Sequence, residues 1–135
     1  VADGRIVGRY KTEAGFGYHQ ANCYADPSSP SLLHVDLMAY DKVFYDDFSL
    51  SSLRTVTPSN HPGALKRYTI RLDAGEEERE SGAAVTSKVL YNGGCEFPRI
   101  NDKMQGKAYR YVYGSGILGD GVDALVKVDV QSGET

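Results

Sequence analysis

The sequence predicts an all-β fold, and three observations lead to that prediction. Segments rich in β-branched and aromatic residues recur at short intervals, and clusters of Gly, Pro, Asn, Asp and Ser separate them. The 15 Gly and 5 Pro are scattered rather than periodic, which fits a turn-rich β domain and excludes a collagen or a disordered linker. Apolar and polar residues alternate within the last segment, as they do in a strand covered on one side.

Seven strands are expected in chain order, at residues 5–10, 16–24, 32–40, 65–72, 85–91, 109–115 and 123–130. Each is a run of β-branched and aromatic residues bounded by turn-forming residues. The alternation is clearest in the last strand, where one face carries Ala124, Val126, Val128 and Val130 and the other carries Leu125, Lys127 and Asp129. Antiparallel strands at this spacing suit a sandwich, a barrel or propeller blades, and composition does not choose among them.

The composition of two connecting segments predicts their local structure. Residues 46–54 begin with acids and place Phe48, Ser51 and Ser52 at helical offsets, which predicts one short helical turn. Residues 75–82 contain four acids and one base between two glycines, which we interpret as a solvated loop and not as a metal site.

The charge balance and the apolar runs exclude several classes of protein. With 15 Lys and Arg against 18 Asp and Glu, the net charge of −3 provides no electrostatic footprint for nucleic acid or an anionic membrane. The longest apolar runs, such as residues 37–40, are too short for a transmembrane helix or a secretory signal. Cys23 and Cys95 have no metal-binding spacing and are interpreted as reduced thiols of a cytosolic protein.

The length of 135 residues allows one domain, and both ends are unusual for a complete one. The chain starts at Val1 without a methionine and stops in the turn-like Gly133-Glu134-Thr135. We therefore expect a fragment of a larger protein.

Few residues carry a chemical signal, since the sequence contains no nucleophile elbow, Cys-x-x-Cys pair, zinc-protease helix motif or phosphate loop. His34 lies within an apolar strand, and its ring is expected to be satisfied by neighbours. His19 is either an ordinary strand residue or a metal ligand. Glu96 lies between a thiol and an aromatic residue, where an acid is costly to bury without a hydrogen-bond donor. It is either a surface acid in a turn or a carboxylate that orients a metal-bound histidine.

Several segments together resemble the carotenoid cleavage oxygenases, most closely the branch of the animal β-carotene oxygenases and retinoid isomerohydrolases. Residues 18–24 and 33–37 are similar to an aromatic-His-x-x-Asn-x-aromatic pattern followed by Val-Asp-hydrophobic. Residues 96–101 and then 106–114 resemble the most recognisable animal-type signature of the family. Their order and approximate spacing agree across nearly the whole chain. The matching segments are residues 18–24, 33–37, 96–101, 106–114 and 125–134.

This resemblance implies a fold and a set of site residues. Residues 1–135 would form part of the family's propeller domain, about two blades of a seven-bladed β-propeller. His19 would be one of four histidines that bind Fe(2+) at the propeller axis, and Glu96 would be the second-layer glutamate that orients such a ligand. Tyr18, Tyr40, Tyr45 and Phe97 would line the tunnel for the polyene substrate; the alternative for these four is ordinary core packing.

The resemblance also implies an activity for the full-length parent. It would be a non-haem Fe(II) dioxygenase that uses O₂ to cleave a conjugated double bond of a carotenoid or apocarotenoid into carbonyl products. The fragment alone is expected to be inactive, since one histidine cannot hold iron against water. Two alternatives stay open: a retinoid isomerohydrolase of the same family, acting on a retinoid, and a non-catalytic β-propeller scaffold segment. We expect a cytoplasmic location with peripheral membrane contact, and no nucleic-acid partner.

Two departures from the family pattern stand out. Ala25 occupies the place of an acid that usually follows the aromatic residue of the His-x-x-Asn segment, and Asp26 comes one residue later. The stretch between Leu72 and Glu96 is shorter than in animal members, which raises the expectation of an incomplete blade.

Overall fold

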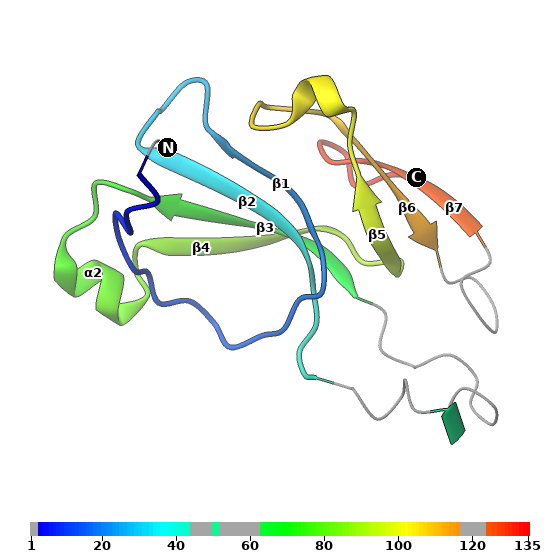
Figure 1. The fold of residues 1–135 in the computed structure, drawn as a ribbon, viewed down its shortest axis with the longest axis horizontal. Helices are drawn as coiled ribbons and strands as arrows, with labels where there is room; N and C mark the ends of the chain where they lie inside the picture. The colour runs from blue at the N-terminus through cyan, green and yellow to red at the C-terminus, as the bar shows by residue number, and fades with distance from the viewer. Residues whose placement is uncertain (1–2, 44–49, 52–62, 117–123) are drawn as a thin grey trace.

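Two antiparallel sheets form the described part of the chain, which in this computed structural model comprises residues 3–43, 50–51, 63–116 and 124–135 (Figure 1). The first sheet contains, in spatial order, β1 (Gln20–Ala25), β2 (Leu32–Ala39), β3 (Ala64–Arg71) and β4 (Val85–Tyr91). The second contains β5 (Cys95–Arg99), β6 (Tyr111–Gly116) and β7 (Ala124–Asp129). Each sheet is a meander of neighbouring antiparallel strands. The predicted all-β fold of about two blades is confirmed.

Both sheets contribute buried side chains to one core. Met38, Leu65 and Leu90 of the first sheet lie in the same buried cluster as Val112 and Val128 of the second. Burying an aliphatic side chain of this size contributes about 1.5–3 kcal/mol to folding. The alternation predicted for the last strand is confirmed, with Val126 and Val128 buried and the intervening Leu125 94% exposed.

The sequence placed most strands within one or two residues. The strands expected at 32–40, 65–72, 85–91 and 123–130 correspond to β2, β3, β4 and β7. Two begin later than expected: β1 starts at Gln20 and β6 at Tyr111. Ahead of β1, Phe16 makes an isolated antiparallel bridge to Tyr40. The chain therefore already lies beside the end of β2 before the continuous ladder begins.

Two strand assignments were wrong. Residues 5–10 form no strand; Ile6 and Val7 are exposed, and this segment passes the end of the first sheet on the side of α2 (Figure 1). Conversely, β5 was missed, because Pro98 cannot donate a ladder hydrogen bond and argues against a strand. The structure accommodates Pro98 in β5, which lies at the edge of its sheet and has an irregular register between Glu96 and Arg99.

Residues 75–82 form a short helix, α2 (Glu76–Ser81), and not the expected loop. The Glu78 carboxylate accepts a hydrogen bond from the backbone N–H of Gly75 at 3.1 Å, which caps the first turn. Three glutamates in that turn complement the helix dipole, and Gly82 ends the helix with a φ of 88°. The same acidic residues that suggested a loop therefore stabilise the first turn of a helix.

Several other expectations concern the connections. Of the helical turn expected at residues 46–54, only Leu50 and Ser51 are described, and both are helical.

The shortened stretch after Leu72 forms α2 and all of β4, so the first sheet has the four strands of a propeller blade. No helix among the described residues is long and apolar enough to cross a membrane.

Asn22 connects the two sheets and so positions one against the other. Its side-chain amide donates to the backbone carbonyl of Lys107 at 3.0 Å, and its carbonyl oxygen accepts from the backbone N–H of Gly106 at 3.1 Å. Asn22 lies on β1, whereas Gly106 and Lys107 lie in the connection between β5 and β6. These bonds satisfy the polar side chain of Asn22, which is buried, and they hold β1 close to the second sheet.

Candidate functional site

His19 and Glu96 lie in direct contact although 77 residues separate them in sequence. His19 Nδ1 and Glu96 Oε2 are 2.7 Å apart. His19 immediately precedes β1 in the first sheet, and Glu96 lies on β5 in the second. The imidazole is 43% exposed, whereas the carboxylate is only 14% exposed. The packing of the two sheets thus leaves the histidine ring partly exposed to solvent, while the more buried carboxylate of Glu96 holds its Nδ1 atom.

The Glu96 carboxylate accepts hydrogen bonds on both of its oxygens. Oε2 accepts from His19 Nδ1 and, at 3.0 Å, from the backbone N–H of Phe97, while Oε1 accepts from the hydroxyl of Tyr40. Because a carboxylate only accepts, the contact requires the histidine hydrogen to reside on Nδ1. The lone pair is then on Nε2, the ring nitrogen available to a metal ion.

Phe97 has a backbone conformation that places its ring beside the same histidine. Its φ of 52° is the one positive value among the described residues other than glycine, and it coincides with the irregular register of β5. In a regular strand Glu96 and Phe97 would point to opposite faces. Here both reach His19, and the Phe97 and His19 ring centroids are 4.9 Å apart. Phe97 is 57% exposed, so its ring borders the open side of the histidine.

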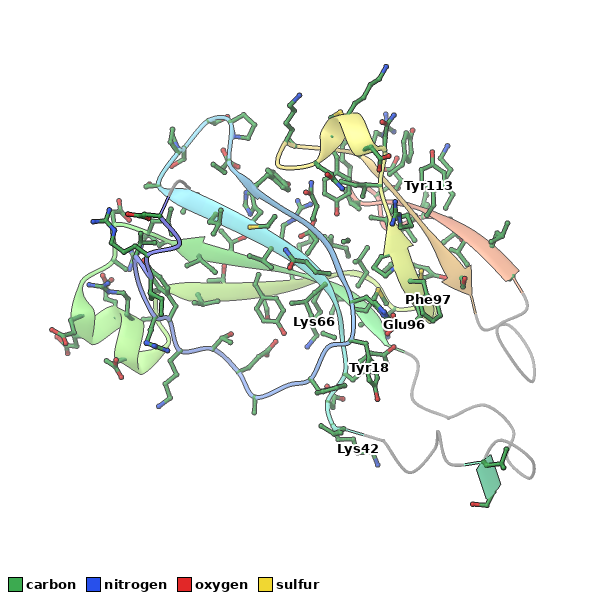
Figure 2. All side chains as sticks on the ribbon, viewed as in Figure 1. Tyr18, Lys42, Lys66, Glu96, Phe97 and Tyr113 are labelled. Atoms are coloured by element: carbon green, nitrogen blue, oxygen red, sulfur yellow. The ribbon has the colours of Figure 1, made fainter. Side chains whose placement is uncertain are left out.

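Tyr18 and Tyr40 complete the aromatic surroundings. Their rings meet edge to face with centroids 5.8 Å apart, and the Tyr18 ring lies 6.4 Å from that of His19. Figure 2 shows Tyr18, Glu96 and Phe97 at the same end of the two sheets. Burial and the hydrogen bond to Glu96 raise the pKa of the Tyr40 hydroxyl, which therefore stays protonated as a donor. Tyr45 lies outside the described residues.

The described residues contain no cluster of three or more His, Cys, Asp and Glu side chains that could hold a metal ion. His34, as predicted, is satisfied elsewhere: Nδ1 contacts Thr69 Oγ1 and Nε2 contacts Asp26 Oδ2, both at 2.9 Å. His19 alone therefore fits a metal centre within this part of the chain. Its anchored Nδ1 and exposed ring suit one ligand of a site whose other ligands come from elsewhere.

Sequence reasoning missed the contact between Tyr40 and Glu96, as well as the role of Asn22 between the sheets. Nothing local pointed to the tyrosine contact, since 56 residues separate the two partners. The spacing of Asn22 from His19 belongs to the family pattern, but its hydrogen bonds to the β5–β6 connection appear only in the folded chain.

Comparisons with known proteins agree on one family. The sequence profile described as "Retinal pigment epithelial membrane protein" matches residues 2–135. An apocarotenoid-15,15'-oxygenase of Synechocystis is 29% identical over 135 residues, which cover 97% of this chain and 25% of that protein. A carotenoid isomerooxygenase of Galleria mellonella is 33% identical over 145 residues, covering 98% of this chain and 26% of that protein.

The solved structures include a relative with the same fold. The crystal structure of cobalt-substituted Synechocystis apocarotenoid oxygenase matches with a TM-score of 0.74 and 28% identity, covering 97% of this chain and 26% of that one. The chain thus spans about a quarter of the length of the relatives that it matches.

Proposed function

The chain belongs to the retinal pigment epithelial membrane protein family, the carotenoid cleavage oxygenases, and from this premise we propose the activity of the enzyme of which it forms part. That enzyme is a non-haem Fe(II) dioxygenase that cleaves a conjugated double bond of a carotenoid or apocarotenoid. One O₂ is consumed, each carbon of the broken double bond receives one oxygen atom, and two carbonyl products form without an external reductant.

One contact carries the proposal: the 2.7 Å pair of His19 Nδ1 and Glu96 Oε2. His34 serves as an internal comparison, because both of its ring nitrogens have partners, as in a purely structural histidine. His19 is held through Nδ1 only, and among the described residues its Nε2 has no hydrogen-bond partner. A carboxylate on one ring nitrogen with the other left open is the usual arrangement of a metal-binding imidazole.

For this function the chain supplies one iron ligand, His19, and the carboxylate of Glu96 that orients it. His19 binds iron through Nε2, and Glu96 fixes the ring orientation and makes the imidazole a better donor. When bound, the iron would supply the chemistry that uses O₂. A single imidazole does not hold iron against water, so the fragment alone is inactive and the remaining ligands belong to other parts of the parent.

The aromatic residues around His19 support an apolar polyene as the substrate. Phe97 and Tyr18 flank the imidazole, and Phe97 exposes most of its ring on the open side. We propose that these two residues contact substrate. Tunnel lining by Tyr40 and Tyr45 stays a prediction, as do a cytoplasmic location and peripheral membrane contact of the parent.

The test uses the full-length parent with three variants. His19→Ala should lose iron and activity together, because one ligand is gone. Glu96→Gln should reduce iron affinity or activity by about 10- to 100-fold, as expected for partners of metal ligands. His34→Ala, the matched control, should retain iron per folded molecule. Stoichiometric iron and normal carotenoid turnover in His19→Ala would show that the site is misassigned.

The products separate this activity from the two alternatives. A dioxygenase consumes one O₂ for each pair of carbonyl products. A retinoid isomerohydrolase releases a retinoid alcohol from its ester without consuming O₂, and a scaffold segment belongs to a protein that binds no iron. Oxygen uptake measured alongside product analysis therefore decides among the three.

A further inference from the structure

Tyr40 contacts the carboxylate that holds His19 and not the histidine itself. Its hydroxyl donates to Glu96 Oε1, while the other oxygen, Oε2, accepts from His19 Nδ1. We propose that Tyr40 is a positioning residue that acts on the metal ligand through Glu96. This inference rests on the proposed function, and it assigns Tyr40 a role that differs from lining a substrate tunnel.

The need for such a residue follows from the freedom of a glutamate side chain. The terminal torsion of Glu is broad, so a carboxylate bonded at one oxygen can turn about its last bond. The donors on Oε2 are His19 and the backbone N–H of Phe97, so both act on the same oxygen of the carboxylate. The Tyr40 hydroxyl bonds the opposite oxygen and thereby fixes the rotation of the whole group.

The arrangement also clamps Glu96 between two residues from the first sheet. His19 precedes β1, Tyr40 directly follows β2, and Glu96 comes from β5 in the second sheet. A small shift of β5 relative to the first sheet would therefore change both hydrogen bonds of Glu96 at once. Because both carboxylate oxygens are bonded to residues of the first sheet, the carboxylate stays oriented relative to that sheet, which also carries the metal ligand.

Tyr40 can serve this purpose because its own position is fixed on several sides. Its backbone exchanges two hydrogen bonds with Phe16, at 2.8 and 2.9 Å. Tyr18 packs edge to face against its ring. Gly63 lies so close that a Cβ atom built there would be 2.5 Å from Tyr40 Cζ and 2.7 Å from its hydroxyl oxygen. Support of this kind around the partners of a ligand holds a site in its working geometry.

The experiment uses the full-length parent loaded with cobalt, a metal already placed in the Synechocystis relative. Cobalt affinity is measured by competition with a chelator, and the visible spectrum of the bound cobalt reports the ligand geometry. Tyr40→Phe should weaken cobalt binding by up to about tenfold, less than the roughly 10- to 100-fold effect of removing a direct partner of a metal ligand. It should also shift the visible bands.

A double-mutant cycle distinguishes positioning from packing. If Tyr40 acts through the carboxylate, Tyr40→Phe should have no further effect on cobalt affinity once Glu96→Ala has removed that carboxylate. An equal effect in both backgrounds would overturn the proposal, because it would show that Tyr40 acts on the site by another route.

Gly63→Ala tests the same idea without touching the hydroxyl group. The added methyl group should displace the Tyr40 ring and reproduce the cobalt affinity and spectrum of Tyr40→Phe. Gly15→Ala is the matched control, since its Cβ would meet the Tyr40 carbonyl oxygen at an ordinary 3.5 Å. Wild-type affinity and spectrum in Tyr40→Phe would overturn the inference, whatever Gly63→Ala shows.

His19→Ala separates this inference from the proposed function. If that variant keeps cobalt with wild-type affinity, the metal-site assignment fails, and the positioning role fails with it. If it loses cobalt while Tyr40→Phe behaves as wild type, only the positioning role is overturned.

Discussion

Tyr109 of the β5–β6 connection donates a hydrogen bond to Asp36 Oδ2 of β2 at 2.6 Å, across the boundary between the two sheets. Asp36 is fully buried, and Arg67 on β3 pairs with both of its oxygens at 2.8 and 2.7 Å. A buried carboxylate is tolerated only when its lone pairs are satisfied. This cluster therefore joins the two sheets with polar contacts inside the core.

Removal of this hydroxyl should destabilise the fold. We expect Tyr109→Phe in the full-length parent to lower the free energy of unfolding by about 1–3 kcal/mol, because Asp36 stays buried with one donor fewer. Chemical denaturation measures the change. Tyr113→Phe is the control: that ring is 46% exposed, and its effect should stay within about 0.5 kcal/mol. Equal effects of the two variants would contradict the role of the buried hydroxyl.

The backbone of Phe97 provides a second test. At a φ of 52° an L-residue is strained by about 1–2 kcal/mol and glycine is not. Phe97→Gly should therefore be more stable than Phe97→Ala, the reverse of the order in a regular strand. Leu125, 94% exposed on β7, supplies the control pair, in which alanine should be the more stable. The same order at both positions, measured by denaturant unfolding, would refute the strained conformation.

The buried thiol of Cys95 should be unreactive in the folded protein. Burial, with a smaller effect from the charge of Glu96, raises the pKa of this thiol from 9.0 to about 11. A rise of this size reduces the thiolate fraction near pH 8.5 by about 100-fold. Alkylation followed by peptide mass spectrometry should find Cys95 modified only after unfolding. Rapid labelling of Cys95 in the native protein would contradict this.

The same shift makes stability depend on pH in the alkaline range. Because the folded pKa of Cys95 lies above the unfolded value, deprotonation favours the unfolded chain. Its contribution is therefore fully present below pH 9.0 and is lost as the pH rises towards about 11. Cys95→Ala should flatten the fall in the free energy of unfolding over this range.

The isolated 135-residue chain should be only marginally stable. Among the described residues, its two sheets end at the edge strands β1, β4, β5 and β7, and Leu125, Tyr113 and Phe97 expose apolar surface. We expect aggregation or partial unfolding of the purified fragment, visible by light scattering and circular dichroism. A cooperative melt of a monomer, independent of concentration, would disprove this expectation.

Local patterns predicted the strands well where one face is buried. In β7 the alternation of valines with exposed residues was sufficient, because a two-residue period repeats whatever the partner strand is. The same reasoning failed at residues 5–10, which have strand-like composition but pair with no strand in the described part of the chain. It also failed at β5, because Pro98 argued against a strand that lies at the sheet edge. It also failed at α2, where acids suit both a loop and a helix start.

The sequence by itself determined the all-β class, most strands and, through family resemblance, the pairing of His19 with Glu96. Only the tertiary structure decided that Tyr40 holds the second oxygen of Glu96, that Phe97 turns back towards His19, and that Asn22 bridges the sheets. The physical reason is the distance along the chain. A strand pattern shows which face a side chain occupies, but contacts between residues far apart depend on strand register and sheet packing, which local periodicity does not encode.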